Sequence, residues 1–360
     1  MTQIAIIGTK SSGKTTLVSV LAKHIAAMVS KKAILLPADY ATGKSVTAVC
    51  EHLNSGQWWE GTAQGTKTQL RFKLHVNSDD GKSPLEIPVE LIDSAGEDLR
   101  HLFVEDRHKT LIQDKHLAGL LQYIQASSII MLIVNLQDFA GQPDGLKRYD
   151  NQTVLKEVVE MFAKNDKHQE IIICFTAGDL YDEYIKEEFD GDIRKYVRQE
   201  LPELYNAARL CRAAGNNLYL HKVSAVADTQ SGFLEDGRPT RLPKPGFKST
   251  GLNELTERIV QSVQRVTLPY PLTNHDAWEW EYTCIKGFFS CRKHRATAKI
   301  PVKNAGGAGN ITVEFSLNGK SNSQTEYFRA DETKYVIVTI PGLPNHRKCE
   351  NGKINCFRTK

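Results

Sequence analysis

Apolar runs alternate with stretches of helical periodicity over roughly the first 265 residues. This alternation predicts an α/β domain on a mostly parallel sheet, because each helix carries the chain back to start another parallel strand. The predicted strands are Ile4–Ile7, Leu70–Val76, Leu85–Ile92, Ile129–Val134, Ile171–Phe175 and Leu218–Val223. The predicted helices are Gly13–Met28, Val154–Ala163, Tyr184–Ala208 and Leu252–Val266. The turn-rich segment 77–84 should join the second and third strands in an antiparallel edge hairpin.

The pattern changes beyond Pro269-Tyr270-Pro271, which ends the last predicted helix. Short alternating segments separated by glycine-containing turns predict a small antiparallel β-domain of sandwich type. These segments are Ala298–Val302, Ile311–Phe315 and Tyr335–Ile340. We therefore predict an α/β domain over 1–267, a linker over 268–283 and a β-domain over 284–360.

Length and charge support this division. A chain of 360 residues is longer than one hydrophobic core usually supports. The net charge is +4, but residues 284–360 hold 14 Lys and Arg against 5 Asp and Glu, a net charge of +9. A basic domain of this kind attracts acidic proteins, nucleic acid or anionic lipid. We favour a protein-interaction module over a nucleic-acid-binding one, because aromatic residues at alternating positions are expected to fill the core.

Other features exclude broad classes of protein. No run of about 18 uncharged apolar residues predicts a membrane span. The segment from Met1 to Ile7 lacks the basic region and cleavage site of a signal peptide. Seven cysteines, an odd and scattered set, do not form the pattern of a secreted disulfide framework. We therefore expect a cytoplasmic protein.

A phosphate-binding motif follows the first predicted strand. Residues 8–15 read Gly-Thr-Lys-Ser-Ser-Gly-Lys-Thr, which fits GxxxxGK[ST] between a strand and a helix. In this motif backbone N–H groups and the helix N-terminus face the phosphates, Lys14 reaches the β and γ oxygens, and the hydroxyl of Thr15 binds Mg²⁺. The candidate phosphate-binding set is Gly8, Lys10, Ser11, Ser12, Gly13, Lys14, Thr15 and Thr16.

Three further loops follow predicted strands. Asp93-Ser94-Ala95-Gly96 has the form DxxG, in which the Asp holds Mg²⁺ through water and the Gly N–H senses the γ-phosphate. Thr176-Ala177-Gly178-Asp179 has the Thr and Asp of [NT]KxD, whose carboxylate accepts the N1–H and 2-amino protons of guanine. Ser224-Ala225 matches the loop whose backbone N–H meets the guanine oxygen. All four loops occur in order at strand ends, where α/β proteins bind ligands.

With these four elements, residues 1–267 resemble a P-loop GTPase of the Ras-like, translation-factor-related (TRAFAC) class. The resemblance implies GTP or GDP with Mg²⁺, held by Thr15, Asp93 and a switch I threonine. Thr62 and Thr66 both suit that position, and we favour Thr62. The implied catalytic set is Lys14, Thr62, Thr66, Gly96 and Glu97. The insert with Pro37–Tyr40 and Trp58–Thr66 resembles bacterial GTPases of conflict or stress systems; its Trp58-Trp59 pair is interpreted as packing.

Departures from the family pattern leave alternatives open. Ala177 replaces the lysine that packs along the base, which should lower affinity or guanine selectivity. Glu97 occupies the position of a water-orienting Gln, where its charge opposes efficient hydrolysis. Ser11 stands where dynamin- and septin-like relatives carry a residue linked to activation by dimerisation, although loop stabilisation is the simpler interpretation. The leading hypothesis is a GTP-binding switch with slow or partner-stimulated hydrolysis and protein effectors. The alternatives are a P-loop ATPase or nucleotide kinase, and a non-hydrolysing scaffold.

The basic domain contains two mirrored clusters of cysteine and histidine. Cys284-x6-Cys291-x2-His294 is reversed in His346-x2-Cys349-x6-Cys356. Antiparallel pairing of the first and last strands would align them as a zinc site. Buried free cysteines in the core are the competing interpretation, which the long x6 spacing favours.

Overall fold

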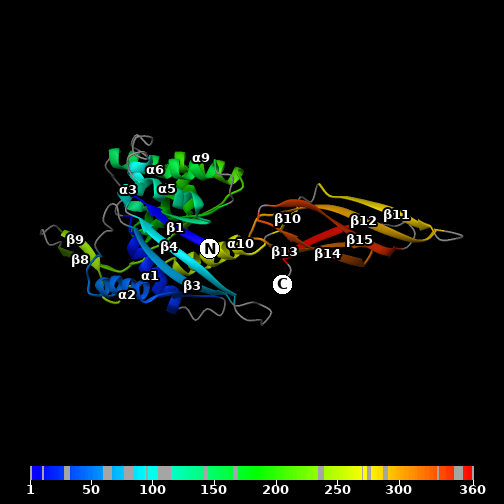
Figure 1. The fold of residues 1–360 in the computed structure, drawn as a ribbon. Coiled ribbons are helices and arrows are strands. Elements are labelled where there is room, and N and C mark those ends of the chain that lie inside the picture. Colours follow the sequence, from blue (N-terminus) through cyan, green and yellow to red (C-terminus); the bar gives the residue numbers. More distant parts are fainter. Residues whose placement is uncertain are drawn as a thin grey trace. The chain divides into compact units, whose positions relative to one another are not determined.

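A computed structural model gives the structure of the chain. It describes residues 2–9, 12–27, 33–59, 67–76, 85–94, 96–103, 115–140, 145–164, 169–233, 239–269, 271–273, 277–286, 291–330, 332–343 and 352–358. The chain forms two compact units, Met1–Val260 and Gln261–Lys360. Each unit has its own core, and helix α10 (Leu252–Thr267) crosses the boundary between the units. Figure 1 shows the elements of both units.

The first unit is built on a seven-stranded sheet of order β2-β3-β4-β1-β5-β6-β7. Its strands are β1 (Thr2–Gly8), β2 (Ala33–Pro37), β3 (Lys67–Val76), β4 (Leu85–Ser94), β5 (Ile129–Asn135), β6 (Glu170–Thr176) and β7 (Asn217–Lys222). The pairs from β4 to β7 are parallel, whereas β3 is antiparallel to both of its neighbours. The mostly parallel sheet with an antiparallel hairpin is confirmed. Strand β2, which the sequence pattern did not predict, lies outside the hairpin and forms the edge.

Helices cover both faces of this sheet (Figure 1). They are α1 (Lys14–Ala27), α2 (Tyr40–Asn54), α3 (Gly96–Phe103), α5 (Lys115–Ala126), α6 (Gly145–Ala163), α7 (Asp182–Phe189), α8 (Ile193–Glu200), α9 (Pro202–Ala213) and α10 (Leu252–Thr267), with short 3₁₀ helices η1 (Leu136–Asp138) and η2 (Gly178–Tyr181). Figure 1 shows α3, α5, α6 and α9 on one side and α1 and α2 on the other.

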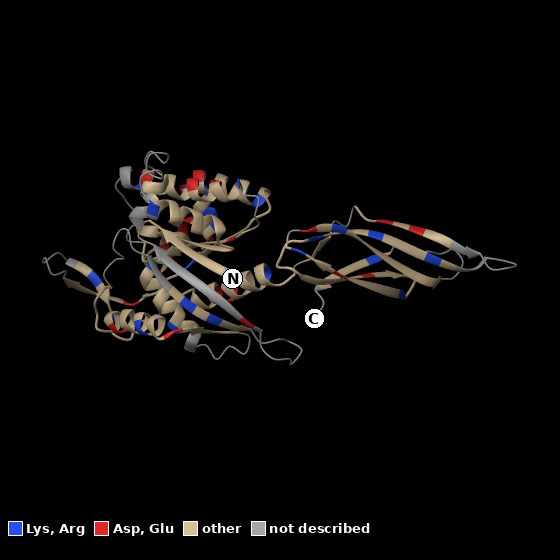
Figure 2. Cartoon of the chain, in the orientation of Figure 1, with Lys and Arg blue, Asp and Glu red and all other residues tan. Residues whose placement is uncertain are grey.

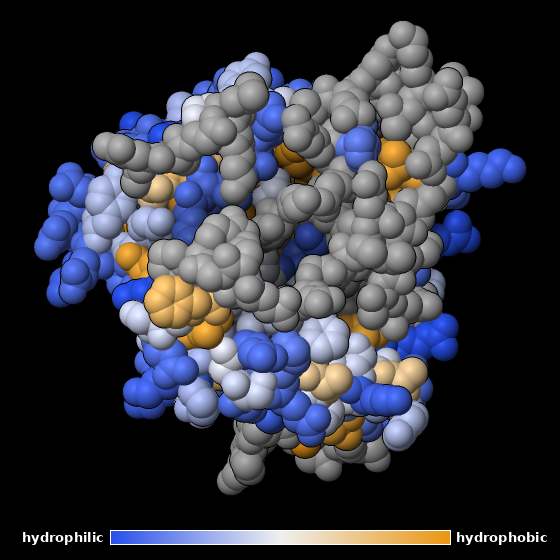
Figure 3. Space-filling view, turned by 90° about the vertical axis from the view of Figure 1, so that its left-hand side faces the viewer, coloured by the Kyte–Doolittle hydropathy of each residue, from blue (hydrophilic) through white to orange (hydrophobic). Residues whose placement is uncertain are grey.

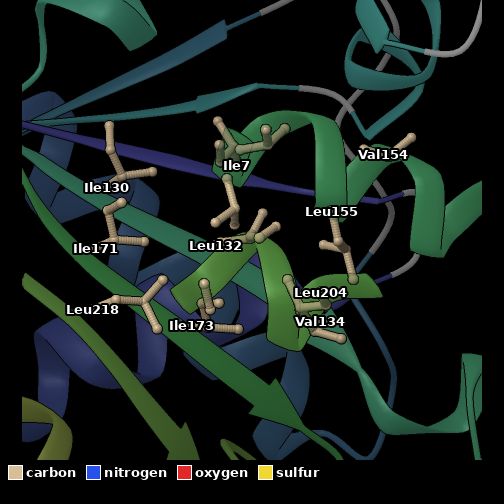
Figure 4. Packing of buried hydrophobic residues seen from close by; sticks show 14 of the residues in the cluster. Ile7, Ile130, Leu132, Val134, Val154, Leu155, Ile171, Ile173, Leu204 and Leu218 are labelled. Atoms are coloured by element: carbon tan, nitrogen blue, oxygen red, sulfur yellow. The ribbon is translucent and has the colours of Figure 1, made fainter. Parts of the chain in front are cut away.

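The central strands are buried because their sequences are continuously apolar. Ile130, Leu132 and Val134 of β5 and Ile171 and Ile173 of β6 have no exposed surface. Together with Val154 and Leu155 of α6 and Leu204 of α9, they belong to one core cluster (Figure 4). Strands covered on both faces need such continuous apolar runs rather than alternation.

The prediction of one continuous helix over Tyr184–Ala208 is wrong, because the structure has three helices in this part of the chain. Asp190 and Gly191 have φ values of 54° and 73°, so the chain takes the left-handed conformation that ends α7. The Asp192 side chain then accepts a hydrogen bond from the Arg194 backbone N–H (2.8 Å) and caps α8. Pro202 begins α9, where its missing N–H is tolerated.

A hairpin of β8 (Thr229–Phe233) and β9 (Pro239–Pro243) lies between β7 and α10. Its base is held by hydrogen bonds from Ala227 N to Lys248 O (2.8 Å) and from Lys244 N to Asp228 O (3.1 Å). Figure 3 looks onto the side of the unit that carries this hairpin, where hydrophobic residues occur in small groups among hydrophilic ones.

The second unit consists of two antiparallel sheets. One contains β10 (Pro271–Thr273), β11 (Glu279–Lys286), β12 (Cys291–Asn304) and β15 (Thr333–Leu343). The other has the order β14 (Lys320–Phe328), β13 (Gly309–Leu317), β16 (Lys353–Arg358). Alternate residues of β12, β13 and β15, with Phe328 of β14, fill one core between the sheets. The antiparallel β-fold is confirmed.

The expected linker, 268–283, contains β10 and the first part of β11, which both pair with β12. Trp278, Trp280 and Tyr282 pack against the core of the second unit. The functional domain boundaries stay a prediction. Lys and Arg are spread over several strands of the sandwich (Figure 2).

Candidate nucleotide-binding site

The loop between β1 and α1 is shaped by its two motif glycines. A Cβ at Gly8 would lie 2.4 Å from the Ile133 carbonyl oxygen, so only glycine fits beside β5. Gly13 has φ +79°, which favours glycine. Lys14 is 7% exposed, and its Nζ donates to the carbonyl oxygens of Gly8 (3.3 Å) and Thr9 (3.4 Å). The ammonium group is thus held over the loop.

Two buried hydroxyls of this loop suit an oxygen-rich ligand. The Oγ1 of Thr9 and the Oγ of Ser12 are buried and have no hydrogen-bond partner among the described residues. Buried hydroxyls normally bond to protein, water or a ligand. Thr15 and Thr16 are half-buried in the first turn of α1, which contains no acidic residue to oppose an anion. The loop therefore fits phosphate; Lys10 and Ser11 lie outside the described residues.

The DxxG segment lies beside this loop. Asp93 of β4 pairs in register with Ile6 of β1, and Gly96 begins α3. The side chains of Asp93 and Glu97 lie outside the described residues, as do Thr62 and Thr66 entirely. The choice of switch I threonine and the part played by Glu97 therefore stay predictions.

The third loop is tied directly to the first. Thr176, the last residue of β6, donates from Oγ1 to the carbonyl oxygens of Ser12 (2.9 Å) and Val134 (3.3 Å). Ala177 follows with φ 56°, and Gly178 N donates to Val223 O (3.3 Å). The chain thus turns sharply and presents Asp179 at the start of η2.

Asp179 and Ser224 join the third and fourth loops. The Asp179 backbone N–H donates to Ser224 Oγ (3.1 Å), and that hydroxyl donates to Asp179 Oδ1. Ser249 Oγ donates to Ala225 O (2.7 Å), which holds the fourth loop from behind. The loops after β1, β6 and β7 are therefore joined at the carboxyl ends of the parallel strands, next to the end of β4.

Burial raises the pKa of the Asp179 carboxyl above its usual 3.8. The hydrogen bond from Ser224 acts in the opposite direction, and the nearby charge of Asp182 raises the pKa further. Because burial removes water from this carboxylate, it gains more from a ligand that supplies N–H groups than a fully solvated carboxylate does.

One basic residue that the sequence pattern did not indicate contacts the third loop. Lys222 ends β7, and its Nζ forms an ion pair with the carboxylate of Asp182, the first residue of α7. Its position two residues before Ser224 was the only available signal, because the pairing of β6 with β7 decides what Lys222 contacts.

The expected register of the mirrored cysteine clusters is wrong. Cys284 pairs with His294 across β11 and β12, whereas Cys356 of β16 pairs with Val313 in the other sheet. The reason is that β12 pairs with β15 on its second side. Within the described residues, no group of three His, Cys, Asp or Glu could hold a metal ion. His346 and Cys349 lie outside the described residues.

Comparison with protein families decides the assignment of the first unit. The model of the family described as Double-GTPase 2 matches residues 2–220, more than half of the chain. The chain belongs to the Double-GTPase 2 family. The P-loop GTPase resemblance of the sequence is therefore confirmed, and the matched segment is a GTPase-like domain.

Solved structures and curated proteins add little to the family assignment. The S. cerevisiae Ski7 GTPase-like domain bound to GDP and inorganic phosphate is 11% identical with a TM-score of 0.31, and its GTP-bound form is 12% identical with a TM-score of 0.32. Each match covers 100% of this chain and 75% of the Ski7 chain. Both TM-scores lie below 0.5. Comparison with curated proteins finds no match.

None of the helices in the described part of the chain combines the length and apolar character needed to cross a membrane.

Proposed function

We propose that this member of the Double-GTPase 2 family is a GTP-binding switch with slow or partner-stimulated hydrolysis. The observation that carries the proposal is the set of hydrogen bonds from Thr176 to Ser12 and between Asp179 and Ser224. These bonds support a site in which the phosphate-binding loop and the base-recognition loop meet at the carboxyl ends of the parallel strands. Asp179 would accept the N1–H and 2-amino protons of guanine, and the Ala225 N–H would meet the guanine oxygen.

The residues of the site fit a magnesium ion, which prefers hydroxyl, carboxylate and phosphate oxygens. Thr15 and Asp93 would hold it, together with Thr62 or Thr66. When bound, the ion supplies positive charge against the β- and γ-phosphates. The chain itself contributes the Lys14 ammonium group, the N–H groups of the loop and the N-terminus of α1, all of which attract the same phosphate oxygens.

Slow turnover follows from Glu97. A carboxylate beside the γ-phosphate repels it unless it is protonated or bound to a cation, so it orients water less well than a Gln would. A partner, or a second copy brought close at Ser11, would then be needed for fast hydrolysis. The basic second unit is assigned to binding a protein effector, with nucleic acid second, and we place the protein in the cytoplasm.

The base preference is tested by competition and by substitution. Purified protein is loaded with labelled GTP and challenged with unlabelled GTP, ATP or XTP, and co-purified nucleotide is identified by mass. Wild type should retain GTP against ATP. Asp179→Asn should lose about tenfold to a hundredfold in GTP affinity, the loss expected for hydrogen bonds to a charged group, and should gain XTP binding. Equal displacement by ATP and GTP would exclude the guanine assignment and favour an ATPase or kinase.

Glu97 also favours a second candidate, a scaffold whose bound GTP is structural. Single-turnover hydrolysis, measured at low and high protein concentration and in sodium or potassium, separates the two functions. Turnover that rises with protein concentration or with a partner supports the switch. Complete retention of GTP under every condition supports the scaffold.

A further inference from the structure

Lys222 lies against the backbone of the guanine-reading loop. It is the last residue of β7 and pairs in register with Phe175, one residue before that loop begins. A Cβ at Gly178 would lie 2.5 Å from Lys222 Cγ and 3.2 Å from Cδ, so the lysine methylenes occupy the space beside Gly178. A side chain at position 178 would therefore force either the loop or Lys222 to move.

The charged end of Lys222 completes a clamp around the loop. Its ammonium group pairs with the carboxylate of Asp182, three residues beyond Asp179. One side of the clamp is therefore β7 and the other is the start of α7, with η2 between them. Ser224, two residues further along the chain, holds Asp179 itself.

The ion pair also affects the charge of the reader. Asp182 opposes ionisation of Asp179, which must be ionised to accept two guanine protons. An ammonium group bound to Asp182 offsets that repulsion. The two side chains are 30% and 51% exposed, and exposed pairs contribute only about 0–1 kcal/mol to stability. The pair should therefore add little to the stability of the fold, and its expected effect is on the position of the loop.

We propose that Lys222, paired with Asp182, is a positioning residue for guanine specificity, and that it replaces the lysine missing at Ala177. The inference rests on the proposed function, because it requires Asp179 to read the base. Ala177 contributes only a methyl group to the loop, whereas Lys222 reaches the same loop from the neighbouring strand. Its role is to fix the direction of the Asp179 carboxylate.

The test compares affinities for GTP and ITP in the full chain. ITP lacks the 2-amino group but keeps the triphosphate and the N1–H, so the GTP-to-ITP affinity ratio reports the bond from the 2-amino group to Asp179. Wild type should prefer GTP by about tenfold, the value of one charge-assisted hydrogen bond. Lys222→Met should lower this ratio to below about threefold with little change in ITP affinity. Lys222→Arg should restore most of it.

Lys195→Met is the matched control, because Lys195 forms an exposed ion pair with Asp190 outside the site. It should leave the ratio unchanged. The inference is overturned if Lys222→Met keeps the wild-type ratio, if it weakens GTP and ITP equally, or if Lys195→Met lowers the ratio as much. Asp179→Asn separates the two proposals. If Asp179→Asn loses guanine preference while Lys222→Met keeps the wild-type GTP-to-ITP affinity ratio, only the role of Lys222 is excluded. No preference in wild type removes both.

Discussion

At the scale of single residues, Asp179 illustrates a conflict between stability and binding. Its carboxyl is half-buried, and burial raises its pKa in the folded protein above the usual 3.8. Guanine recognition nevertheless requires the ionised form. A carboxyl group whose pKa is raised in the folded state contributes stability that is fully present below its unfolded pKa. That contribution is lost as the pH rises through the folded pKa. The nucleotide-free protein therefore holds an unfavourable charge at neutral pH.

GTP affinity should consequently fall when the pH is lowered. Because the pKa of Asp179 is raised, this fall should begin at a higher pH than it would for an Asp of ordinary pKa. As the pH falls through the raised pKa, Asp179 becomes protonated and can no longer accept both guanine protons. Measured from pH 7 downward, GTP binding by wild type should weaken, whereas Asp179→Asn should show no such step. Without nucleotide, Asp179→Asn should also unfold at a higher temperature than wild type at pH 7. This difference in thermal midpoint should become smaller as the pH is lowered. A constant margin would contradict this account.

Gly178→Ala should disturb the same loop by steric overlap with Lys222. The added Cβ would approach Lys222 Cγ to 2.5 Å, so the loop or the lysine must move. Overpacking of this kind costs about 1–3 kcal/mol, and guanine preference should weaken as well. Gly119→Ala in α5 is the control, since its Cβ meets nothing within 4 Å. Alanine in a helix should stabilise that variant by about 0.5–1 kcal/mol in urea unfolding.

At the scale of elements, the β8–β9 hairpin and the segment after α2 are held together. Trp58 Nε1 donates to the Arg241 carbonyl oxygen (2.7 Å), and a Cβ at Gly56 would lie 3.5 Å from Pro243 O. Trp59 packs edge-on against His52 at 5.6 Å. The interpretation of both tryptophans as packing residues is thus only part of their role, because Trp58 also bonds to the hairpin that follows Ser224–Ala225.

Trp58→Phe should loosen this connection while keeping an aromatic ring. Loss of one hydrogen bond is worth about 1 kcal/mol, so the amides of β8 (Thr229–Phe233) and β9 (Pro239–Pro243) should exchange roughly fivefold faster with solvent. Hydrogen exchange followed by mass spectrometry measures this directly. Trp59→Phe leaves the bond to Arg241 intact and should not change exchange in the hairpin. Equal effects of the two substitutions would mean that the hydrogen bond does not hold the hairpin.

Elements differ in how far their sequence predicts them. The strands β5 and β6 were predicted because runs such as Ile129–Val134 fit few environments other than a sheet covered on both sides. Strand β2 was missed, since five residues that form an edge depend on pairing with β3. The break between α7 and α8 depends on left-handed φ values at Asp190 and Gly191, which helical periodicity does not reveal.

At the scale of the whole molecule, each unit has its own hydrophobic core. The cluster around β5 and β6 in the first unit shares no residue with the cluster around β12 and β13 in the second. The proposed nucleotide site belongs entirely to the first unit. Ligand binding should therefore stabilise one core and leave the other unchanged.

Calorimetry of the full chain should accordingly show two unfolding transitions. GTP with Mg²⁺ at a hundred times its Kd should stabilise the first unit by about 2.7 kcal/mol and raise its midpoint by several degrees. The transition of the β-unit should not move. Lys14→Ala, which removes the ammonium group proposed to bind the phosphates, is the control and should abolish the shift. A single transition that moves as a whole would show that the two cores unfold together.

The sequence by itself determined the buried strands, the glycines of the phosphate loop and the order of the four loops at strand ends. These features depend on residues close in sequence, where hydrophobic runs and turn chemistry act locally. Only the tertiary structure decided the contact of Lys222 with Gly178, the bond from Thr176 to Ser12 and the separation of Cys356 from Cys284. Each of these follows from strand order and register, which are set by packing between segments far apart in the chain.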